Sequence, residues 1–473
     1  MSDRILKGPL HLQVLKFGAP LALGMGLQTT FNLVDAYILG RLEQGTASAA
    51  LGAIGICDQL AAMGTILSYG LSVATAAILS RRKGAGETSD IRRVAWQSLL
   101  LVGALSLLFG LGALFGAGAV MRDVVGAKGR VAELGTSYLR AMVGGSFSIF
   151  LLLHLTTIQR ALGSSKTPIA TLLGANVLNL VLAVLLVYGP GPAPPVFAWG
   201  PPISALLGLP RLELMGAAWA TILARMVVLI PTIVIVVRRF GLFGRRDWAL
   251  PDFEVLRRIW DIGWPTSVQL VVRIAAMLAM HSIVARAFTT EADQSATTAL
   301  GIVFRLETMA LFVGLGWGSA AQTFMGQNLG ASFVARAKAS GWYATLYNAA
   351  MMAILALSYR VGGRSIVAFF DSTPEVVDFA TKYIAVVGPS YVGLGIGIVL
   401  GSTIQGAGAT RQTLVLDALV VFCLQIPASL LVVFVWRLGP ERLWDIIAGT
   451  YFTYAILYVW NYQRGRYLSE QVV

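Results

Sequence analysis

The second half of the chain repeats the first at a constant offset of 246 residues. The segment 157–161 (TIQRA) recurs at 403–407 (TIQGA). The pair Gly-Ala at 84–85 recurs at 330–331, and other short matches share the same offset. Chance can supply one such match, but several at one offset indicate a duplicated structural unit. The chain is therefore expected to fold as two similar halves.

The composition places this duplicated unit in a membrane. Hydrophobic residues make up 56% of the chain, charged residues make up 12%, and the mean hydropathy is +0.74. A soluble domain of this length needs more polar residues to cover its surface. A helix needs about 20 apolar residues to cross the hydrocarbon. By that rule we predict twelve spans, at 15–39, 49–79, 94–120, 137–158, 169–188, 215–237, 262–288, 297–324, 341–358, 383–404, 414–436 and 445–460.

Each half of the chain holds six of these predicted spans. An even number of crossings returns the chain to the side where it began, so both halves have one orientation and are related by an axis along the membrane normal. We expect an all-α integral membrane protein, with a first lobe at 1–240 and a second at 241–473. Two such lobes are typical of secondary transporters, which have a cavity between them.

The net charge of +13 indicates membrane orientation rather than nucleic-acid binding. With the N-terminus placed in the cytoplasm, the cytoplasmic segments hold 21 Lys and Arg, the opposite side holds 10, and five lie within spans. Membrane proteins carry this excess on the cytoplasmic side. We therefore predict a multi-pass protein of the cell inner membrane with both termini in the cytoplasm and no nucleic-acid partner.

The segment 189–210, between spans five and six, contains seven prolines. Such a density predicts extended, fairly stiff chain rather than helix. The segment is expected on the outer face, either as a lid over the cavity or as a surface insertion. The surface insertion is the better supported of the two interpretations.

Acids within the first two spans are the leading functional candidates, because ionisable groups in hydrocarbon are costly. Asp35 follows Gln28 and Asn32 at helical spacing, so the three share one polar face of span one. Such a face must point toward protein or water. Asp58, in span two, lies at a comparable depth. For Asp35 we favour function, whereas for Asp58 function and a structural hydrogen bond are equally supported.

The later spans hold a second set of polar residues. Arg305 and Glu307 are two residues apart and cannot pair on one helix. Arg273, in span seven, is the expected partner of Glu307, with an anionic substrate group as the alternative partner of that arginine. Asp417 lies near the start of span eleven and is expected to reach the membrane interface.

Two asparagines, Asn176 and Asn179, share a face of span five. Together with an acid on a neighbouring helix, they would offer oxygen ligands to a small hard cation. Interhelical hydrogen bonding is the stronger interpretation of these residues.

Several motifs resemble, in order and spacing, those of the multidrug and toxic compound extrusion (MATE) family. They are 34–40 (VDAYILG), 49–55 (AALGAIG), 160–168 (RALGSSKTP), 176–179 (NVLN), 216–221 (GAAWAT), 304–307 (FRLE) and 326–331 (GQNLGA). The resemblance implies a twelve-helix exporter of organic, often cationic, compounds in exchange for protons or sodium. It also implies that Asp35 is the coupling aspartate, that Gln28 faces substrate, and that Asn179 belongs to a cation site in the first lobe.

Two departures from the family pattern bear on the coupling ion. Ala183 stands where many members have an acid, and Arg273 stands where several have a glutamate, eight residues after Pro265. Both departures weaken a sodium site more than a proton site. The candidate coupling residues are Asp35, Asn179 and Asp58, and the candidate substrate contacts are Gln28, Asn32, Tyr37, Asn176, Arg273 and Glu307.

We therefore expect a monomeric secondary active efflux transporter that exchanges organic, amphiphilic or cationic compounds for H⁺ or Na⁺ by alternating access. No cofactor beyond the coupling ion and no metal site are expected. The alternative is a flippase for a lipid-linked or anionic amphiphile from the same superfamily, because the spans hold five arginines against four acids. An enzyme is not expected, since the sequence offers no nucleophile with a base and no metal-ligand cluster.

Overall fold

The computed structural model describes residues 3–42, 44–124, 129–244, 247–290 and 293–470. Within these ranges the side chains are described except at 3–4, 28–33, 35–36, 44–56, 58–63, 124 and 130–131. The side chains of Gln28, Asn32, Asp35 and Asp58 therefore lie outside the described residues. The predictions that rest on these four residues remain predictions.

The described part of the chain is helical and contains no strand. The first half consists of α1 (Asp3–Leu6), α2 (Leu10–Gly40), α3 (Gln44–Ala85), α4 (Thr88–Ala119), the π-helical turn η1 (Val120–Val124), α5 (Gly129–Gly144), α6 (Ser146–Ala161), α7 (Lys166–Tyr188), η2 (Pro195–Phe197), α8 (Gly200–Leu206) and α9 (Glu213–Phe240). The second half consists of α10 (Phe253–Phe288), α11 (Ser295–Gly330), α12 (Val334–Phe370), α13 (Pro374–Val387), η4 (Gly388–Ser390), α14 (Tyr391–Gly406), α15 (Thr410–Ala418), η5 (Leu419–Gln425), α16 (Ile426–Leu430), η6 (Leu431–Val435), α17 (Pro440–Arg464) and η7 (Arg466–Ser469).

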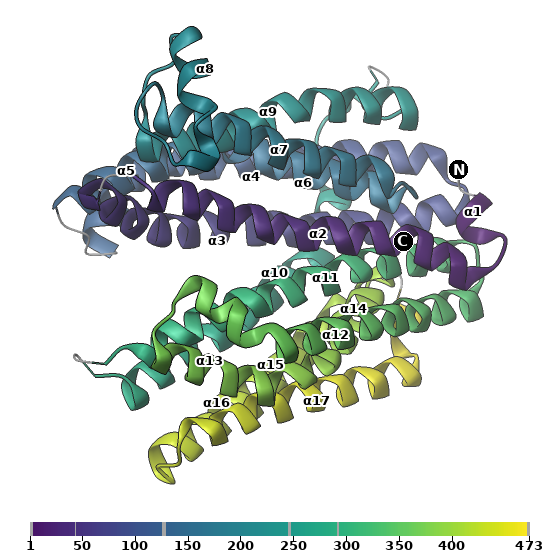
Figure 1. Ribbon diagram of the computed structural model, residues 1–473. Coiled ribbons are helices and arrows are strands. Elements are labelled where there is room, and N and C mark those ends of the chain that lie inside the picture. Colours follow the sequence, from purple (N-terminus) through teal and green to yellow (C-terminus); the bar gives the residue numbers. More distant parts are fainter. Residues whose placement is uncertain (1–2, 43, 125–128, 245–246, 291–292, 471–473) are drawn as a thin grey trace.

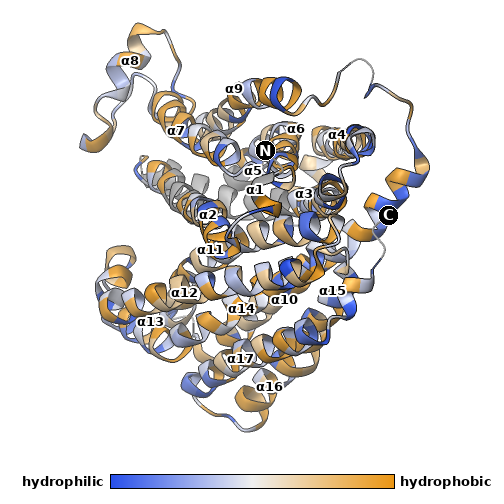
Figure 2. Cartoon of the chain, turned by 90° about the vertical axis from the view of Figure 1, so that its right-hand side faces the viewer, coloured by the Kyte–Doolittle hydropathy of each residue, from blue (hydrophilic) through white to orange (hydrophobic). Residues whose placement is uncertain are grey.

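These helices correspond to the twelve predicted spans. Ten helical segments of the described chain are long and apolar enough to cross a membrane. The helices α3 and α17, of 42 and 25 residues, are also long enough to do so. Large apolar side chains such as Phe115 and Val361 are exposed, and Figure 2 shows apolar residues along the outer faces of the helices. A surface of this kind suits contact with lipid.

The helices form two groups that meet along α2, α3, α10 and α11. In Figure 1, α2 to α9 make the upper group and α10 to α17 the lower group. The two groups lie close together at the end of the bundle that carries both termini, and they diverge toward the opposite end (Figure 1). The predicted two-lobed all-α architecture is confirmed, whereas the lobe boundary at residue 240 stays a prediction.

The junction between the two groups is fastened to α4. The Asp252 carboxylate forms an ion pair with Arg93, and Trp248 stacks on Trp96 with ring centroids 5.9 Å apart. The Asp252 side chain also accepts hydrogen bonds from the first turn of α10, so it caps that helix. The hydrogen bond from Arg93 holds the pKa of Asp252 below its ordinary value. The linker is therefore attached to the first group at its end nearest α10.

The proline-rich segment is partly helical, so the prediction that it contains no helix was wrong. It contains η2 and α8, and prolines occupy the first turn of each. Proline is tolerated there because the first amide groups of a helix have no intrahelical acceptor to lose. Phe197 is buried and its ring packs edge-on against Tyr37 at 6.1 Å. The segment is thus anchored to the first group at the end remote from the termini.

Two symmetry-related glycines hold α3 and α11 together near the termini. A Cβ atom at Gly84 would overlap the carbonyl oxygen of Gln327, and one at Gly330 would overlap the carbonyl oxygen of Arg81. Gly84 and Gly330 are related by the offset of 246 residues, and so are Arg81 and Gln327. The repeated sequence therefore builds the same backbone contact twice, and both contacts require glycine.

Replacing Gly84 with alanine is expected to destabilise the protein by about 1–3 kcal/mol, the usual cost of overpacking a close contact. Gly103, in α4, is the matched control because open space surrounds its Cβ position. Alanine there is expected to be neutral or stabilising, since it forms helix better than glycine. The measurement is the thermal unfolding midpoint in detergent micelles. Equal midpoints for Gly84→Ala and wild type would contradict this role of Gly84.

Candidate functional site

A cavity of about 580 Å³ lies between the two groups of helices. We call it the central cavity. Its walls include Phe109, Met142 and Phe150 from the first group and Leu311 and Phe312 from the second. Its polar lining includes Tyr69, Thr157, Arg160, Arg225, Arg273 and Gln405. The cavity thus offers both apolar surface and cationic groups to a bound molecule.

The central cavity is closed toward the termini by hydrogen bonds between α11 and the first group. The Gln327 side-chain amide donates to the carbonyl oxygen of Ala161 at 2.8 Å, and that of Gln322 donates to Val73 at 3.0 Å. The Thr323 hydroxyl donates to the carbonyl oxygen of Arg160 at 3.3 Å. The end of α6 therefore forms part of the cavity floor.

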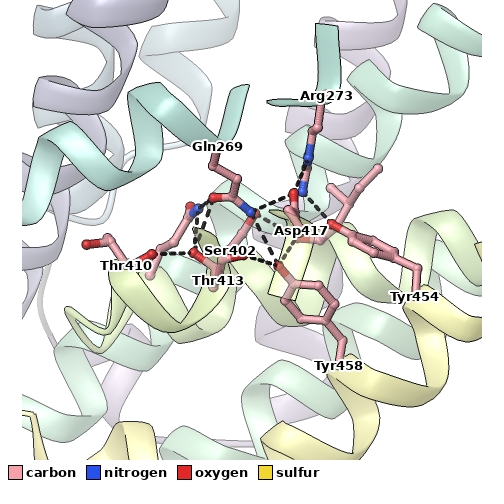
Figure 3. A network of polar contacts seen from close by, with 10 residues as sticks. Gln269, Arg273, Ser402, Thr410, Thr413, Asp417, Tyr454 and Tyr458 are labelled. Carbon is pink, nitrogen blue, oxygen red and sulfur yellow. Dashed lines mark hydrogen bonds and ion pairs between the residues drawn. The ribbon is translucent and has the colours of Figure 1, made fainter. Parts of the chain in front are cut away.

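An ion pair between Arg273 of α10 and Asp417 of α15 lies inside the second group (Figure 3). The Nε atom of Arg273 donates to Oδ2 of Asp417 at 2.7 Å, and its Nη2 atom donates to the Tyr454 hydroxyl. The Asp417 side chain is 1% exposed, whereas that of Arg273 is 24% exposed. The aspartate is buried inside the group, and the arginine joins it to the cavity.

Further hydrogen bonds surround Asp417 (Figure 3). The Tyr458 hydroxyl donates to Oδ1 of Asp417 at 2.6 Å, and the Gln269 amide nitrogen donates to Oδ2 at 2.9 Å. The Gln269 amide oxygen accepts from Gln405 at 2.7 Å and from Thr413 at 3.2 Å. The network satisfies the buried carboxylate on both oxygens, as a buried charge requires.

The predicted pair between Arg273 and Glu307 was therefore wrong, and so was the prediction that Asp417 reaches the membrane interface. The helix α15 packs against α10, which buries Asp417, near the end of α15, beside Arg273 instead of leaving it at the surface. Close, hydrogen-bonded contact with Asp417 satisfies the guanidinium of Arg273. Glu307 has other partners.

Glu307 lies between two tyrosine hydroxyls. Tyr383 donates to one carboxyl oxygen at 2.8 Å, and Tyr451 donates to the other. No cation pairs with Glu307 within the described part of the chain. Glu307, Arg273 and Asp417 all line a smaller cavity of about 170 Å³ inside the second group. Glu307 is therefore a carboxyl group that faces a cavity with phenol groups as its hydrogen-bond donors.

The predicted residues of the first group lie apart from this network. The Thr221 hydroxyl of α9 donates to the amide oxygen of Asn179 at 3.0 Å, which is the interhelical hydrogen bond expected of that asparagine. The Asn176 amide nitrogen is buried without a hydrogen-bond partner. Tyr37 lies at the end of α2, 40% exposed, with the Arg41 guanidinium 5.1 Å from its ring centroid. The structure does not bring these three residues to the described lining of either cavity.

Sequence reasoning missed most of the network in the second group, although a pattern for it exists. Three helices each present two polar residues at i, i+4, which places them on one face. The pairs are Gln269 with Arg273, Thr413 with Asp417, and Tyr454 with Tyr458. Polar faces on three membrane helices need hydrogen-bond partners, so they are expected to contact one another or water rather than lipid.

A model of the MatE family matches residues 20–185 and 272–431. The chain belongs to the MatE family. The two matched segments fall one in each half and end 246 residues apart, which agrees with the offset of the internal repeat. The motif-based resemblance is thereby confirmed.

Curated relatives of this MatE chain extend over most of its length. The "Probable multidrug resistance protein YpnP" of Bacillus subtilis is 27% identical over 427 residues, covering 90% of this chain and 89% of the relative. The "FAD transporter" of Shewanella oneidensis is 24% identical, covering 91% of this chain and 90% of the relative. A "Probable multidrug resistance protein NorM" of Bradyrhizobium diazoefficiens is 24% identical, covering 98% and 94%.

Solved structures share the fold of this MatE chain. One is described as the outward-facing conformation of a multidrug resistance MATE family transporter, with a TM-score of 0.87, 21% identity and 99% coverage of both chains. Another is a MOP superfamily transporter from Pyrococcus furiosus, described as having a binding pocket of reverse polarity, with the same TM-score, identity and coverage. At this identity the likeness establishes the fold alone.

Proposed function

We propose that this MatE chain is a secondary active exporter of organic compounds that works by alternating access, with H⁺ or Na⁺ as the coupling ion. The observation that carries the proposal is the central cavity, which lies between two repeated helix groups and is closed at one end. Repeat-built transporters bind their substrates at such an interface and move one group against the other. The names of the multidrug resistance relatives support export of small organic molecules.

Both termini lie at the closed end of the bundle (Figure 1). We propose that this end faces the cytoplasm and that the protein spans the cell inner membrane. The structure would then represent the outward-facing state, and closing the opposite end would complete the transport cycle. The described cavity walls contain side chains from both groups, so a relative motion of the groups would change the site itself. The bound compound can bias this motion only if it binds the two states with different affinity.

A proton fits the second group better than sodium does. Arg273 occupies the position beside Asp417, and that carboxylate already accepts hydrogen bonds from Tyr458 and Gln269. A sodium ion would have to displace a guanidinium from its carboxylate. Among the described residues Glu307 has only phenol donors, so uptake of a proton would remove a charge that no described cation balances from the membrane interior. Asp35 remains the coupling acid proposed for the first group.

The function can be tested with purified protein in liposomes under an imposed pH or Na⁺ gradient. Organic cations, anions and neutral amphiphiles are added in turn, and a pH-sensitive dye or ²²Na⁺ flux reports the gradient. At least one compound is expected to dissipate a gradient faster than in protein-free liposomes. The proposal fails if no compound moves either gradient and no compound is itself transported.

The orientation can be tested with single cysteines in a variant whose native Cys57 and Cys423 are replaced by serine. Val196 is 69% exposed in the proline-rich segment, and Ser332 is exposed between α11 and α12. In intact cells a membrane-impermeant maleimide is expected to label Val196→Cys, whereas Ser332→Cys reacts only after permeabilisation. Labelling of both in intact cells would contradict the cytoplasmic placement of the termini.

A further inference from the structure

Arg160 is a buried guanidinium without an acidic partner among the described residues. It lies at the end of α6, is 8% exposed, and lines the central cavity at its closed end. Its Nη2 atom donates to the Thr157 hydroxyl at 2.6 Å, but its Nε atom is buried without a hydrogen-bond partner. Within the described part of the chain, no carboxylate forms an ion pair with it. Arg160 therefore retains both its charge and an unused donor.

This arrangement differs from that of Arg273 in the same cavity. The charge of Arg273 is balanced by Asp417 at 2.7 Å. Arginine stays protonated in proteins, so Arg160 cannot relieve its burial by losing a proton. Unpaired charges inside membrane proteins are costly, and those that persist mark functional sites. An anion in the cavity would supply the missing partner.

The surroundings of Arg160 indicate what such an anion would carry. The described lining of the central cavity contains three arginines and no Asp or Glu. It also contains two hydroxyl groups that are buried without partners, those of Ser146 and Thr266. The remaining wall is largely aromatic and aliphatic, as at Phe109 and Phe150. The described lining of the cavity therefore combines cationic and hydroxyl groups with apolar walls, and Arg160 is the arginine at its closed end.

We infer that Arg160, positioned by Thr157, forms a subsite for the anionic group of an amphiphilic compound, a carboxylate or a phosphate. The guanidinium fork matches either group by two parallel hydrogen bonds, and its free Nε–H belongs to that fork. The apolar body of the compound would lie against the aromatic walls. This inference rests on the proposed export function and narrows its substrate class to organic anions.

Binding to purified protein in nanodiscs tests the subsite. The probes share one fluorescent twelve-carbon chain and end in a carboxylate, a phosphate, a methyl ester or an amine. Wild type is expected to bind the two anions more tightly than the ester and the amine. Arg160→Gln is expected to weaken anion binding by about 10-fold to 100-fold, the equivalent of ~1.5–3 kcal/mol for hydrogen bonds to a charged group. The affinity for the methyl ester is expected to differ by less than about twofold between Arg160→Gln and wild type, because the ester carries no charge for Arg160 to bind.

Two further variants keep the test sharp if Arg160→Gln folds poorly. Arg160→Lys keeps the charge but loses the fork, so its loss of anion affinity should be intermediate. Arg140→Ala, at an exposed position in α5, is the matched control and should bind like wild type. If wild type binds the phosphate probe more tightly than the carboxylate probe, the anionic group is identified as a phosphate. The reverse order of affinities identifies it as a carboxylate.

The inference is overturned if wild type binds the ester or the amine as tightly as the anions. It is also overturned if well-folded Arg160→Gln and Arg160→Lys keep full preference for the anions. Failure of the export function would look different, because wild-type liposomes would then move no compound and no ion gradient. Export that ignores substrate charge would leave the proposed function standing and remove only this subsite.

Discussion

Replacing Arg273 with alanine is expected to lower the free energy of unfolding by roughly 3 kcal/mol. The variant leaves the Asp417 carboxylate, 1% exposed, without its cation. An unpaired buried charge is far more costly than the pair was stabilising. We place the effect at the low end of the usual range because Arg273 keeps 24% of its side chain exposed. The thermal unfolding midpoint in detergent micelles measures it.

Arg286→Ala is the matched control, since this arginine is exposed on the same helix. Its effect should stay within about 0.5 kcal/mol, as for most surface substitutions. Combining Arg273→Met with Asp417→Asn removes both charges and should recover part of the lost stability. If Arg273→Ala unfolds at the wild-type temperature, Asp417 does not depend on this arginine. If the double variant is worse than Arg273→Ala, the surrounding hydrogen bonds matter more than the charge.

Asp35→Asn is expected to reduce gradient-driven export to the background of protein-free liposomes. The substitution keeps the shape of the side chain but removes the group that can release a proton. Asp35 shares a helical face with Gln28 and Asn32 in a span where exposure of that face to lipid is costly. Exchange of labelled for unlabelled compound without an ion gradient should persist, because binding and motion do not require the proton to leave.

The same liposomes should be used to compare Asp58→Asn and Glu307→Gln with Asp35→Asn. Glu307→Gln is expected to retain part of the gradient-driven rate if the first group carries the main coupling acid. Normal export by Asp35→Asn together with loss in either of the other variants would place the coupling acid elsewhere. If Asp35→Asn also loses the exchange of labelled for unlabelled compound in the absence of an ion gradient, the fold is damaged. The thermal unfolding midpoint would reveal this damage.

The architecture could be predicted from the sequence because lipid imposes a simple constraint. Every backbone polar group must be satisfied inside the membrane, so apolar runs of about 20 residues become helices. The internal repeat then determined that two halves exist. The helix ends were predicted less well, because helices such as α3 continue beyond the hydrocarbon into water. Apolar composition marks the membrane boundary, not the end of the helix.

The partners of the charged residues could not be predicted in the same way. Arg273 and Asp417 are 144 residues apart in sequence, and their contact depends on how α10 and α15 pack. The composition placed both residues within or near predicted spans. It did not show how either helix is rotated about its own axis, and that rotation decides which neighbours a side chain faces. The tyrosines beside Glu307 were missed for a related reason, since aromatic residues are common in membrane helices. Tyr383 and Tyr451 become recognisable as its donors only when the three helices are in place.

The glycine contacts near the termini limit what can control the transport cycle. At Gly84 and Gly330 the two groups meet through main-chain atoms, which neither gain nor lose protons at physiological pH. A change of pH or ionic strength therefore leaves this seam as strong as before. Whatever opens it must act from within the two cavities, where the arginines of the central cavity and the carboxyl groups of the smaller one can contact a bound molecule or ion. The side chains that bind the transported compound or ion would then be separate from the main-chain contacts that hold the two groups together. Each set could change during evolution without the other.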